Sequence, residues 1–300
     1  MTGVHDSAVQ QPLPISVVIP AYRRADMVGR AVRSALDQVP PPMEVIVVDD
    51  CSGDGTAAAA SAAGATVIAH ETNSGPAATR ATGVGAAAGE WIAFLDSDDR
   101  WLPGHLATLW ANRDGHVLVG AAGRGSADGR LFGHPGPRPK LFRGPADVIL
   151  PYNRVTPSGA MVRSAALAAA GGVRATHYAE DLDLWIRVLE HGTGVALPQV
   201  TFEYFQHDGQ ASSDLGRMSD GLDAVVAGYE NRPWCSRRVV LAAQAMPRWD
   251  QCRAALRTGD RKSALRHASA FLRPSRALGL VRLLIIRRRL AGRRQAPAAG

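Results

Sequence analysis

The sequence predicts an α/β protein with a mostly parallel β-sheet flanked by helices, followed by a helical C-terminal extension. Over the first hundred residues, short apolar runs alternate with segments of helical periodicity, which is typical of strand–helix–strand units. The apolar runs are continuous, which indicates strands that are buried on both faces, as in a parallel sheet. After residue 213 only helical patterns occur, which predicts the extension.

The first half of the chain has the clearer pattern. We expect strands over residues 15–19, 44–48, 66–69 and 91–95. We expect helices over residues 24–38, 55–63 and 75–89, where alanine or regularly spaced apolar residues are followed by proline or glycine. Later elements are a loop or small insertion over 120–145, strands over 159–162, 195–197 and 201–205, and helices from 164 and over 180–190.

Length and composition indicate a globular protein with a hydrophobic core. The chain has 300 residues, of which 46% are hydrophobic and 20% are charged, and a chain of this size buries about 75% of its unfolded surface. These values exclude collagen-like, disordered and disulfide-scaffold proteins. The three cysteines, Cys51, Cys235 and Cys252, cannot all pair with one another, which favours a reducing compartment, and we expect the cytoplasm.

The positive charge lies at the C-terminal end. Residues 261–300 contain ten Arg, one Lys and no Asp or Glu, so the net charge of +7 leaves −4 for the rest of the chain. We therefore expect no nucleic-acid partner, and we expect a basic amphipathic tail over residues 261–295 that binds the inner face of a membrane peripherally. The alternatives for the tail are packing against the rest of the chain and binding of nucleic acid.

We divide the chain into three parts. Residues 1–14 have no apolar core and no early positive cluster, so we expect a flexible leader rather than a signal peptide. Residues 15–212 form the main domain, and residues 213–300 form the helical extension. No apolar run approaches the roughly 20 residues that a membrane-spanning helix needs.

Charged side chains follow the predicted strands at the points where the strands end. They are Arg23 and Arg24 after the first strand, Asp49 and Asp50 after the second, and Asp96, Asp98 and Asp99 after the fourth. Ligands of open parallel sheets bind at this edge. Crowded carboxylates repel one another unless some are protonated or a cation lies among them. Mg²⁺ and Mn²⁺ prefer oxygen ligands and keep positions open for substrate phosphates, so the sequence predicts a metal-bridged diphosphate site.

Five segments, in order, resemble the family 2 glycosyltransferases of the GT-A fold: ISVVIPAYRR, EVIVVDDCSGDGT, NSGPAATRATG, WIAFLDSDD and AEDLDLWIRV. The resemblance covers roughly residues 15–207. It implies a Rossmann-like GT-A fold with a nucleotide-binding half over residues 15–100 and an acceptor half over residues 101–212. It also implies transfer of a sugar, with inversion and with Mg²⁺ or Mn²⁺, from a UDP-sugar donor, or alternatively a dTDP-sugar, to a hydroxyl of a saccharide, lipid-linked or natural-product acceptor.

The resemblance assigns the nucleotide-sugar to one set of residues: Pro20, Ala21, Tyr22, Arg24, Asp50, Asn73, Arg80, Asp96 and Ser97. Asp50 matches the carboxylate that accepts a hydrogen bond from the base, a donor that uracil and thymine carry and cytosine lacks. Arg80 matches an arginine that reaches the diphosphate, although Ala81 stands where the family usually has Asn. The alternatives are that Asp49 and Asp50 cap the turn into the next helix and that Arg80 is a solvated helix arginine.

The resemblance assigns the metal to Asp98 directly, with Asp96, Asp99 and His207 as further candidates. Because alternate residues of an extended strand project the same way, Asp96 and Asp98 can face one ion while Asp99 turns toward sugar or solvent. Phe205 or Gln206 replaces the arginine that usually precedes the family's histidine. Capping of a following helix is the alternative for the acidic cluster, and solvation is the alternative for His207.

Transfer needs a base that takes the proton of the acceptor hydroxyl, and the resemblance places that base at Asp181. It places Glu180, Asp183, Trp185 and Ser158 on the acceptor side. The alternative for the acidic residues is that they only complement the dipole of the helix that they precede.

Two other function classes remain open from the residues alone. A phosphatase or phosphotransferase with an aspartyl nucleophile also has an Asp-x-Asp motif after an apolar strand, but usually after the first one. A non-catalytic nucleotide-sugar-binding module would fit the departures at Ala81 and Phe205.

Overall fold

The computed structural model describes residues 11–134, 136–149, 155–174, 179–206, 215–237, 239–241, 243, 251–252, 255–256 and 259–272. The chain divides into two compact units, Met1–Ser213 and Asp214–Gly300. His207 and residues 273–295 of the expected tail lie outside the described residues. Within the described residues, no helix is long and apolar enough to cross a membrane.

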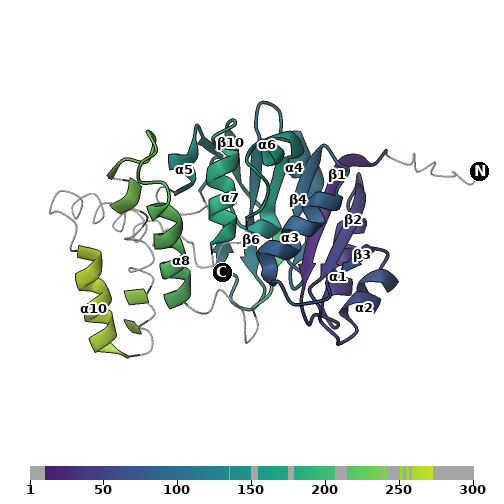
Figure 1. The fold of residues 1–300 in the computed structure, drawn as a ribbon, viewed down its shortest axis with the longest axis horizontal. Coiled ribbons are helices and arrows are strands. Elements are labelled where there is room, and N and C mark those ends of the chain that lie inside the picture. The colour runs from purple at the N-terminus through teal and green to yellow at the C-terminus, as the bar shows by residue number, and fades with distance from the viewer. Residues whose placement is uncertain are drawn as a thin grey trace, which may run out of the picture. The chain divides into compact units, whose positions relative to one another are not determined.

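The first unit is built on a ten-stranded mixed sheet with the order β3-β2-β1-β4-β9-β6-β10-β5 (Figure 1). The parallel half contains β3 (Thr66–Ala69), β2 (Pro42–Asp49), β1 (Leu13–Ala21) and β4 (Trp91–Phe94). In the other half, β9 (Ala160–Arg163) runs antiparallel between β4 and β6 (Leu118–Gly125), and β6 is parallel to β10 (Gly194–Tyr204). Three short strands add antiparallel pairs: β5 (Arg100–Trp101) and β8 (Lys140–Phe142) with β10, and β7 (Leu131–Phe132) with β6.

Helices cover both faces of the sheet. Side chains of α1 (Val28–Leu36) and α4 (His105–Ala111) share one core cluster with β1. In Figure 1, α3 (Gly75–Ala86) and α7 (Glu180–Val188) lie in front of the strands. The remaining elements of the first unit are α2 (Thr56–Ala62), α5 (Pro145–Ile149), α6 (Ser164–Ala169) and the 3₁₀ turn η1 (Pro157–Gly159). The second unit contains α8 (Leu215–Ala227) and α10 (Arg261–Leu272).

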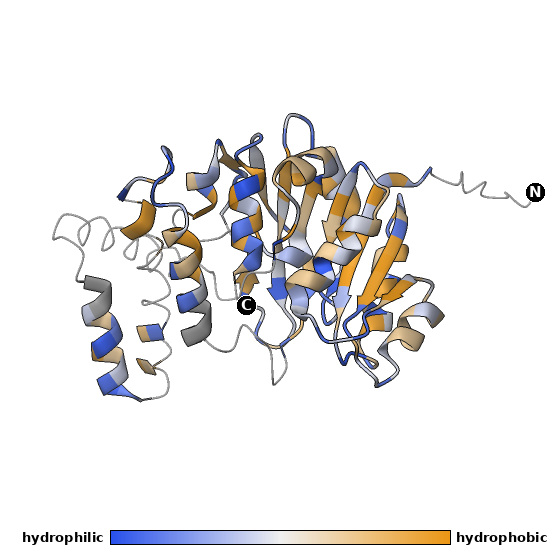
Figure 2. Cartoon of the chain, in the orientation of Figure 1, coloured by the Kyte–Doolittle hydropathy of each residue, from blue (hydrophilic) through white to orange (hydrophobic). Residues whose placement is uncertain are grey.

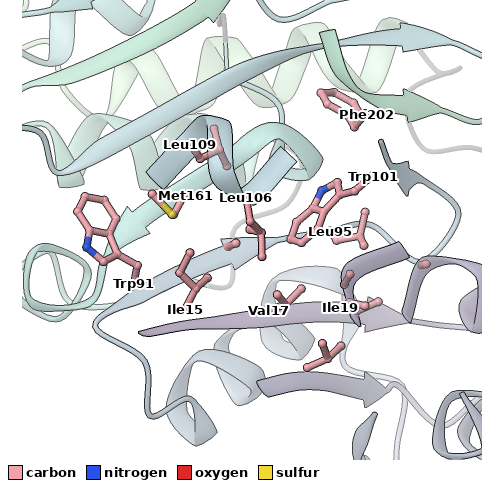
Figure 3. Close-up of a cluster of buried hydrophobic side chains, with 14 of the residues drawn as sticks. Ile15, Val17, Ile19, Trp91, Leu95, Trp101, Leu106, Leu109, Met161 and Phe202 are labelled. Atoms are coloured by element: carbon pink, nitrogen blue, oxygen red, sulfur yellow. The ribbon is translucent and has the colours of Figure 1, made fainter. Parts of the chain in front are cut away.

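The core follows from the apolar runs of the parallel strands, and β1 and β2 are hydrophobic along most of their length (Figure 2). Ile15, Val17 and Ile19 of β1 point into one cluster with Leu106 and Leu109 of α4, and all five are fully buried (Figure 3). Burial of one such side chain contributes about 1.5–3 kcal/mol to the free energy of unfolding. The cluster holds the strands rigidly, and their carboxyl ends carry the candidate site.

The prediction of a loop over residues 120–145 is wrong, because β6 occupies its first part. Glycines obscured this strand in the sequence, yet the packing needs them. A Cβ on Gly123 would lie 2.2 Å from the ring of Phe202, and one on Gly120 would lie 3.0 Å from Val155. Glycine in a strand often marks such a close approach.

The two short strands expected over residues 195–197 and 201–205 form a single strand, β10. The pairing of β10 with β6 shifts register between Ala196 and Val200 and again between Val200 and Phe202. Pro198 lies in this interval, and because proline has no N–H to donate, it interrupts a regular ladder. Residues 198–200, which separate the two expected strands, are therefore an irregularity within one strand rather than a loop.

Candidate active site

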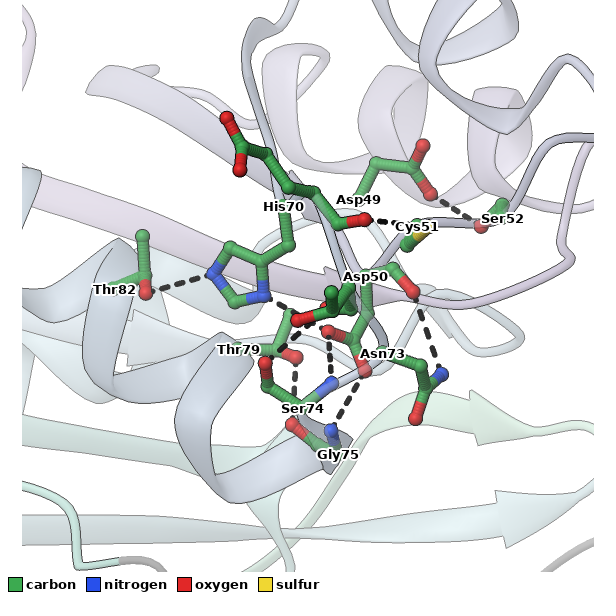
Figure 4. A network of polar contacts seen from close by, with 12 residues as sticks. Asp49, Asp50, Cys51, Ser52, His70, Asn73, Ser74, Gly75, Thr79 and Thr82 are labelled. Carbon is green, nitrogen blue, oxygen red and sulfur yellow. Dashed lines mark hydrogen bonds and ion pairs between the residues drawn. The ribbon is translucent and has the colours of Figure 1, made fainter.

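The carboxyl ends of β1 and β2 form the first part of the site. The Asp50 N–H donates to Ala21 O at 2.8 Å, which joins the two strand ends. The Asp50 carboxylate accepts from the N–H of Ser74 at Oδ1 (2.9 Å) and from the N–H of Gly75 at Oδ2 (2.8 Å) (Figure 4). These amides begin α3, so Asp50 caps that helix rather than α2, which follows β2. Its role in binding a base stays a prediction.

The residues around Asp50 differ in how they face the site. Pro20 and Ala21 are buried within β1, whereas Tyr22 is 39% exposed at its end. Asn73 Nδ2 donates to Asp50 O at 3.3 Å, which closes the loop before α3. Asp49 accepts from the Ser52 hydroxyl instead of joining the other carboxylates.

The second part of the site is the acidic segment after β4. Asp99 is buried; Ser158 Oγ donates to its Oδ2 (2.5 Å) and the Phe205 N–H donates to its Oδ1 (3.1 Å). Burial, followed by the charge of Asp96, raises the pKa of Asp99 well above its usual value. The expectation that Asp99 turns toward sugar or solvent is therefore wrong, because both of its oxygens accept hydrogen bonds within the protein. Its role as a metal ligand stays a prediction.

Asp98 and Asp96 are the more accessible carboxylates of this segment, with side chains 17% and 28% exposed, whereas Ser97 between them is buried. Arg24 Nη2 lies 3.8 Å from Asp98 Oδ2. Arg30 of α1 donates to the backbone oxygen of Asp98 at 2.7 Å. Two guanidinium groups therefore lie beside Asp98.

Arg80 links the acidic segment to α7. Its Nη2 lies 2.6 Å from Asp96 Oδ1, and its Nη1 lies 2.5 Å from Glu180 Oε1. Although burial alone would lower it, the charges of Asp96 and Glu180 raise the pKa of Arg80. Arg80 is therefore not a solvated helix arginine, and in this structure its partners are two carboxylates.

Asp181 follows Glu180 at the start of α7 and is partly buried. Burial, followed by the charge of Glu180, raises the pKa of Asp181 to about 7. The charge of Arg80 acts in the opposite direction. A carboxyl group with such a pKa is suited to accept a proton near neutral pH.

Three residues expected on the acceptor side point into the protein. Asp183 is buried and pairs with Arg187 at 2.8 Å. Trp185 is buried, donates to Val155 O at 3.1 Å and packs edge-on against Phe94. Ser158 is buried and bridges Asp99 and the Asp96 N–H (3.1 Å). The side chains of Asp183, Trp185 and Ser158 therefore anchor α7 and the acidic segment, and their place on the acceptor side stays a prediction.

The crowding argument for a metal ion also needs correction. Within the part of the chain that the structure describes, no group of three or more His, Cys, Asp or Glu side chains could hold a metal ion. Arg80 pairs with Asp96, and backbone N–H groups donate to Asp50, so part of the negative charge is compensated within the protein. Burial still raises the pKa of Asp96, although the charge of Arg80 acts in the opposite direction. The accessible carboxylates of Asp96 and Asp98 still fit Mg²⁺ or Mn²⁺, which proteins often hold by one or two carboxylates together with substrate phosphates.

Sequence reasoning missed two residues of the site, His70 and Arg30. His70 Nδ1 lies 2.8 Å from Asp50 Oδ1. The guanidinium of Arg30 stacks on the ring of Phe205 at 3.6 Å. The position of His70 directly after the third strand could have indicated it, because β3 neighbours β2 at the same sheet edge. Arg30 lies within a helix, and no sequence signal distinguishes it.

The sequence and the fold are similar to those of known glycosyltransferases. The sequence model of glycosyl transferase family 2 matches residues 16–168. The succinoglycan biosynthesis protein ExoO of Rhizobium meliloti is 42% identical over 110 residues, which are 36% of this chain and 32% of ExoO. The chain thus matches about a third of that relative's length.

Two solved structures share the fold. Residues 1–349 of Staphylococcus aureus TarS, in complex with UDP-GlcNAc, superpose with a TM-score of 0.66 at 19% identity, covering 86% of this chain and 80% of that one. The mannosyltransferase PcManGT of Pyrobaculum calidifontis, in complex with GDP-Man and Mn²⁺, gives a TM-score of 0.61 at 18% identity, covering 86% and 81%. At these identities the comparison establishes the GT-A fold.

Proposed function

The chain belongs to glycosyl transferase family 2, and on this basis we propose that it transfers a sugar from a nucleoside-diphosphate donor to a hydroxyl group, with inversion at the anomeric carbon. One observation carries the proposal. Arg80 joins Asp96 of the acidic segment to Glu180, and so brings the expected diphosphate site beside Asp181. Such a transfer needs a group that accepts the proton of the hydroxyl and groups that stabilise the charge of the departing diphosphate.

The reaction is a single displacement. The acceptor oxygen attacks the anomeric carbon while the bond from that carbon to the diphosphate oxygen breaks. The proton of the acceptor hydroxyl passes to an Oδ atom of Asp181, and the electron pair leaves with the nucleoside diphosphate. Because no covalent sugar–protein intermediate forms, one carboxylate is sufficient.

Asp98 and Asp96 would hold Mg²⁺ or Mn²⁺ together with the donor diphosphate, and His207 stays a predicted further ligand. When bound, the ion supplies positive charge to the departing diphosphate. Arg24 and Arg30, which lie beside Asp98, add positive charge to the same region. Stabilisation of the leaving group is usually the larger part of the rate enhancement in such reactions.

The donor and acceptor are proposed from the site and from the relatives. Asp50 suits a base with a ring N–H, and the resemblance to the family favours uracil, so we propose UDP, or alternatively dTDP, as the carrier. ExoO is a succinoglycan biosynthesis protein, which supports a saccharide acceptor and a role in polysaccharide biosynthesis. A lipid-linked or natural-product hydroxyl is the alternative acceptor.

The two rival functions fit the site less well. Asp96, which a phosphatase would need as nucleophile, is ion-paired with Arg80 and follows β4 rather than the first strand. A module that only binds nucleotide-sugars does not need a carboxyl group like Asp181, whose pKa of about 7 suits proton transfer.

Binding of the expected tail to a membrane is a separate proposal. α10 covers the first part of residues 261–295, and the composition of this segment is basic and amphipathic. Flotation with anionic liposomes, with and without residues 273–300, tests it. Equal flotation of both forms would exclude a contribution of the tail.

A thermal-shift panel tests the proposed function. We expect UDP, dTDP and their sugars to raise the melting temperature in the presence of Mn²⁺, because a ligand that binds only the folded state stabilises it. Inorganic phosphate serves as the control. No shift with any nucleoside diphosphate would contradict the proposal.

A further inference from the structure

We propose that His70 is a positioning residue that orients Asp50 to recognise the nucleobase, an inference that rests on the proposed function. His70 directly follows β3, and its N–H donates to Asp49 O at 2.8 Å. The backbone of His70 is therefore anchored to the same strand end that carries Asp50.

The imidazole of His70 connects Asp50 to α3 (Figure 4). Nδ1 lies 2.8 Å from Asp50 Oδ1, and Nε2 lies 2.9 Å from Thr82 Oγ1. An ionised carboxylate only accepts hydrogen bonds, so Nδ1 is the donor. A hydroxyl can donate or accept, so Thr82 holds the ring whether or not Nε2 carries a proton.

These contacts leave one acceptor position on the Asp50 carboxylate. A carboxylate offers about four such positions. Oδ1 accepts from the Ser74 N–H and from His70, and Oδ2 accepts from the Gly75 N–H. The side chain of Asp50 is only 3% exposed, so an incoming ligand meets a carboxylate with a set orientation and one position left on Oδ2.

A single acceptor in a set direction discriminates between bases. Uracil, thymine and guanine carry a ring N–H beside a carbonyl group, whereas cytosine and adenine do not. A site built around a hydrogen bond rejects ligands that leave its buried polar group unpaired. Without His70, Oδ1 would regain an acceptor position, and only the Ser74 and Gly75 N–H groups would orient the carboxylate, so discrimination would fall.

Calorimetric titration of the full chain tests this role. The ligands are UDP, dTDP and GDP, which have the ring N–H, and CDP and ADP, which lack it. The variants are His70→Phe, which removes both contacts, His70→Asn, whose amide can still donate near the position of Nδ1, and Thr82→Val, which removes only the hydroxyl. His116→Phe is the matched control, because His116 also contacts a threonine, Thr193 at 3.0 Å, but before the amino end of β6.

We expect the wild type to bind its preferred diphosphate at least tenfold more tightly than CDP or ADP. His70→Phe should weaken binding of the preferred diphosphate roughly tenfold, because a misdirected Asp50 would lose its hydrogen bond to the base, and leave CDP and ADP unchanged. His70→Asn should restore part of the preference, Thr82→Val should have a smaller effect than His70→Phe, and His116→Phe should have none. In turnover assays the donor KM should rise while kcat changes little.

Four outcomes would count against the proposal in different ways. Equal weakening of all diphosphates by His70→Phe, or no weakening, would overturn the positioning role of His70. A wild type that binds all five diphosphates equally would also overturn it, together with the proposed choice of UDP or dTDP, while leaving the proposed sugar transfer in place. A wild type that binds none of them would overturn the proposed function itself. Melting curves of each variant identify a loss of folding.

Discussion

Nη1 of Arg80 lies 2.5 Å from Oε1 of Glu180, although 100 residues separate them in the chain. The same guanidinium binds Asp96, so one buried cation holds α3, the end of β4 and the start of α7 together. Removing one partner of such an ion pair leaves the other charge buried and uncompensated, which lowers the free energy of unfolding by about 3–5 kcal/mol. The contact therefore sets the distance between the acidic segment and Asp181.

The Asp181→Asn variant should bind the donor normally and lose turnover. The amide is close in size to the carboxylate but cannot accept the acceptor proton, and general-base catalysis typically contributes about 10²–10⁴ in rate. Donor affinity by calorimetry and turnover by release of nucleoside diphosphate measure the two effects. Asp114→Asn, an equivalent change on an exposed side chain, is the control, and near-normal turnover of Asp181→Asn would remove Asp181 as the base.

Turnover should rise with pH through about 7. Because burial raises the pKa of Asp181 to about 7, its carboxyl group is protonated and inactive as a base below that pH and ionised above it. A profile of kcat/KM against pH between 5 and 9 should show this single rise, because kcat/KM reports the pKa of the ligand-free protein. A kcat/KM that stays constant from pH 5 to 9 would exclude a titrating base with this pKa.

In the Arg80→Gln variant, the rise of activity with pH should occur at a higher pH than in the wild type. Arg80 lowers the pKa of Asp181, and its loss also leaves the charge of Glu180 uncompensated. Arg80→Lys keeps the charge but not the planar fork that binds two carboxylates, so its shift should be smaller. Melting curves first establish that each variant is folded. If the rise of activity with pH then stays at the wild-type pH in both variants, Arg80 does not act on the pKa of Asp181.

The Asp98→Asn variant should lose the dependence of donor binding on Mn²⁺. A neutral amide is a weaker ligand for a hard divalent ion than a carboxylate. The affinity for the donor should fall at least tenfold in Mn²⁺ and change little in EDTA. Equal loss in both conditions would indicate that Asp98 contacts the donor without the ion.

The Gly123→Ala variant should destabilise the protein. The added Cβ would lie 2.2 Å from the ring of Phe202, a fully buried side chain that cannot move aside, and overpacking of this kind typically costs about 1–3 kcal/mol. Gly85→Ala in α3 is the matched control, because its Cβ would meet open space and alanine favours the helix by about 1 kcal/mol. Urea unfolding measures both changes, and equal stability of Gly123→Ala and wild type would contradict the packing argument.

The sequence predicted the parallel half of the sheet well, because its strands are unbroken apolar runs with proline or glycine between the elements. The expected strand over residues 66–69 has the bounds of β3 itself. The second half was harder, because Gly120 and Gly123 removed the apolar signal from β6. Their role depends on Val155 and Phe202, which lie far along the chain and meet them only in the fold.

The candidate site was predictable in position but not in its contacts. Strand ends located Asp50, Asp96 and Asp98, since parallel strands present their carboxyl ends at one edge. Which carboxylates turn inward depends on partners from distant segments, such as Ser158 for Asp99 and Arg187 for Asp183. Periodicity alone does not reveal such partners.

The most direct measurement is a crystal structure of the chain grown with a nucleoside-diphosphate sugar that it binds, in the presence of Mn²⁺. We predict the base beside Asp50, the diphosphate beside Asp96 and Asp98, and the anomeric carbon on the side of Asp181. A donor bound at another edge of the sheet, with Asp181 remote from its anomeric carbon, would contradict the account.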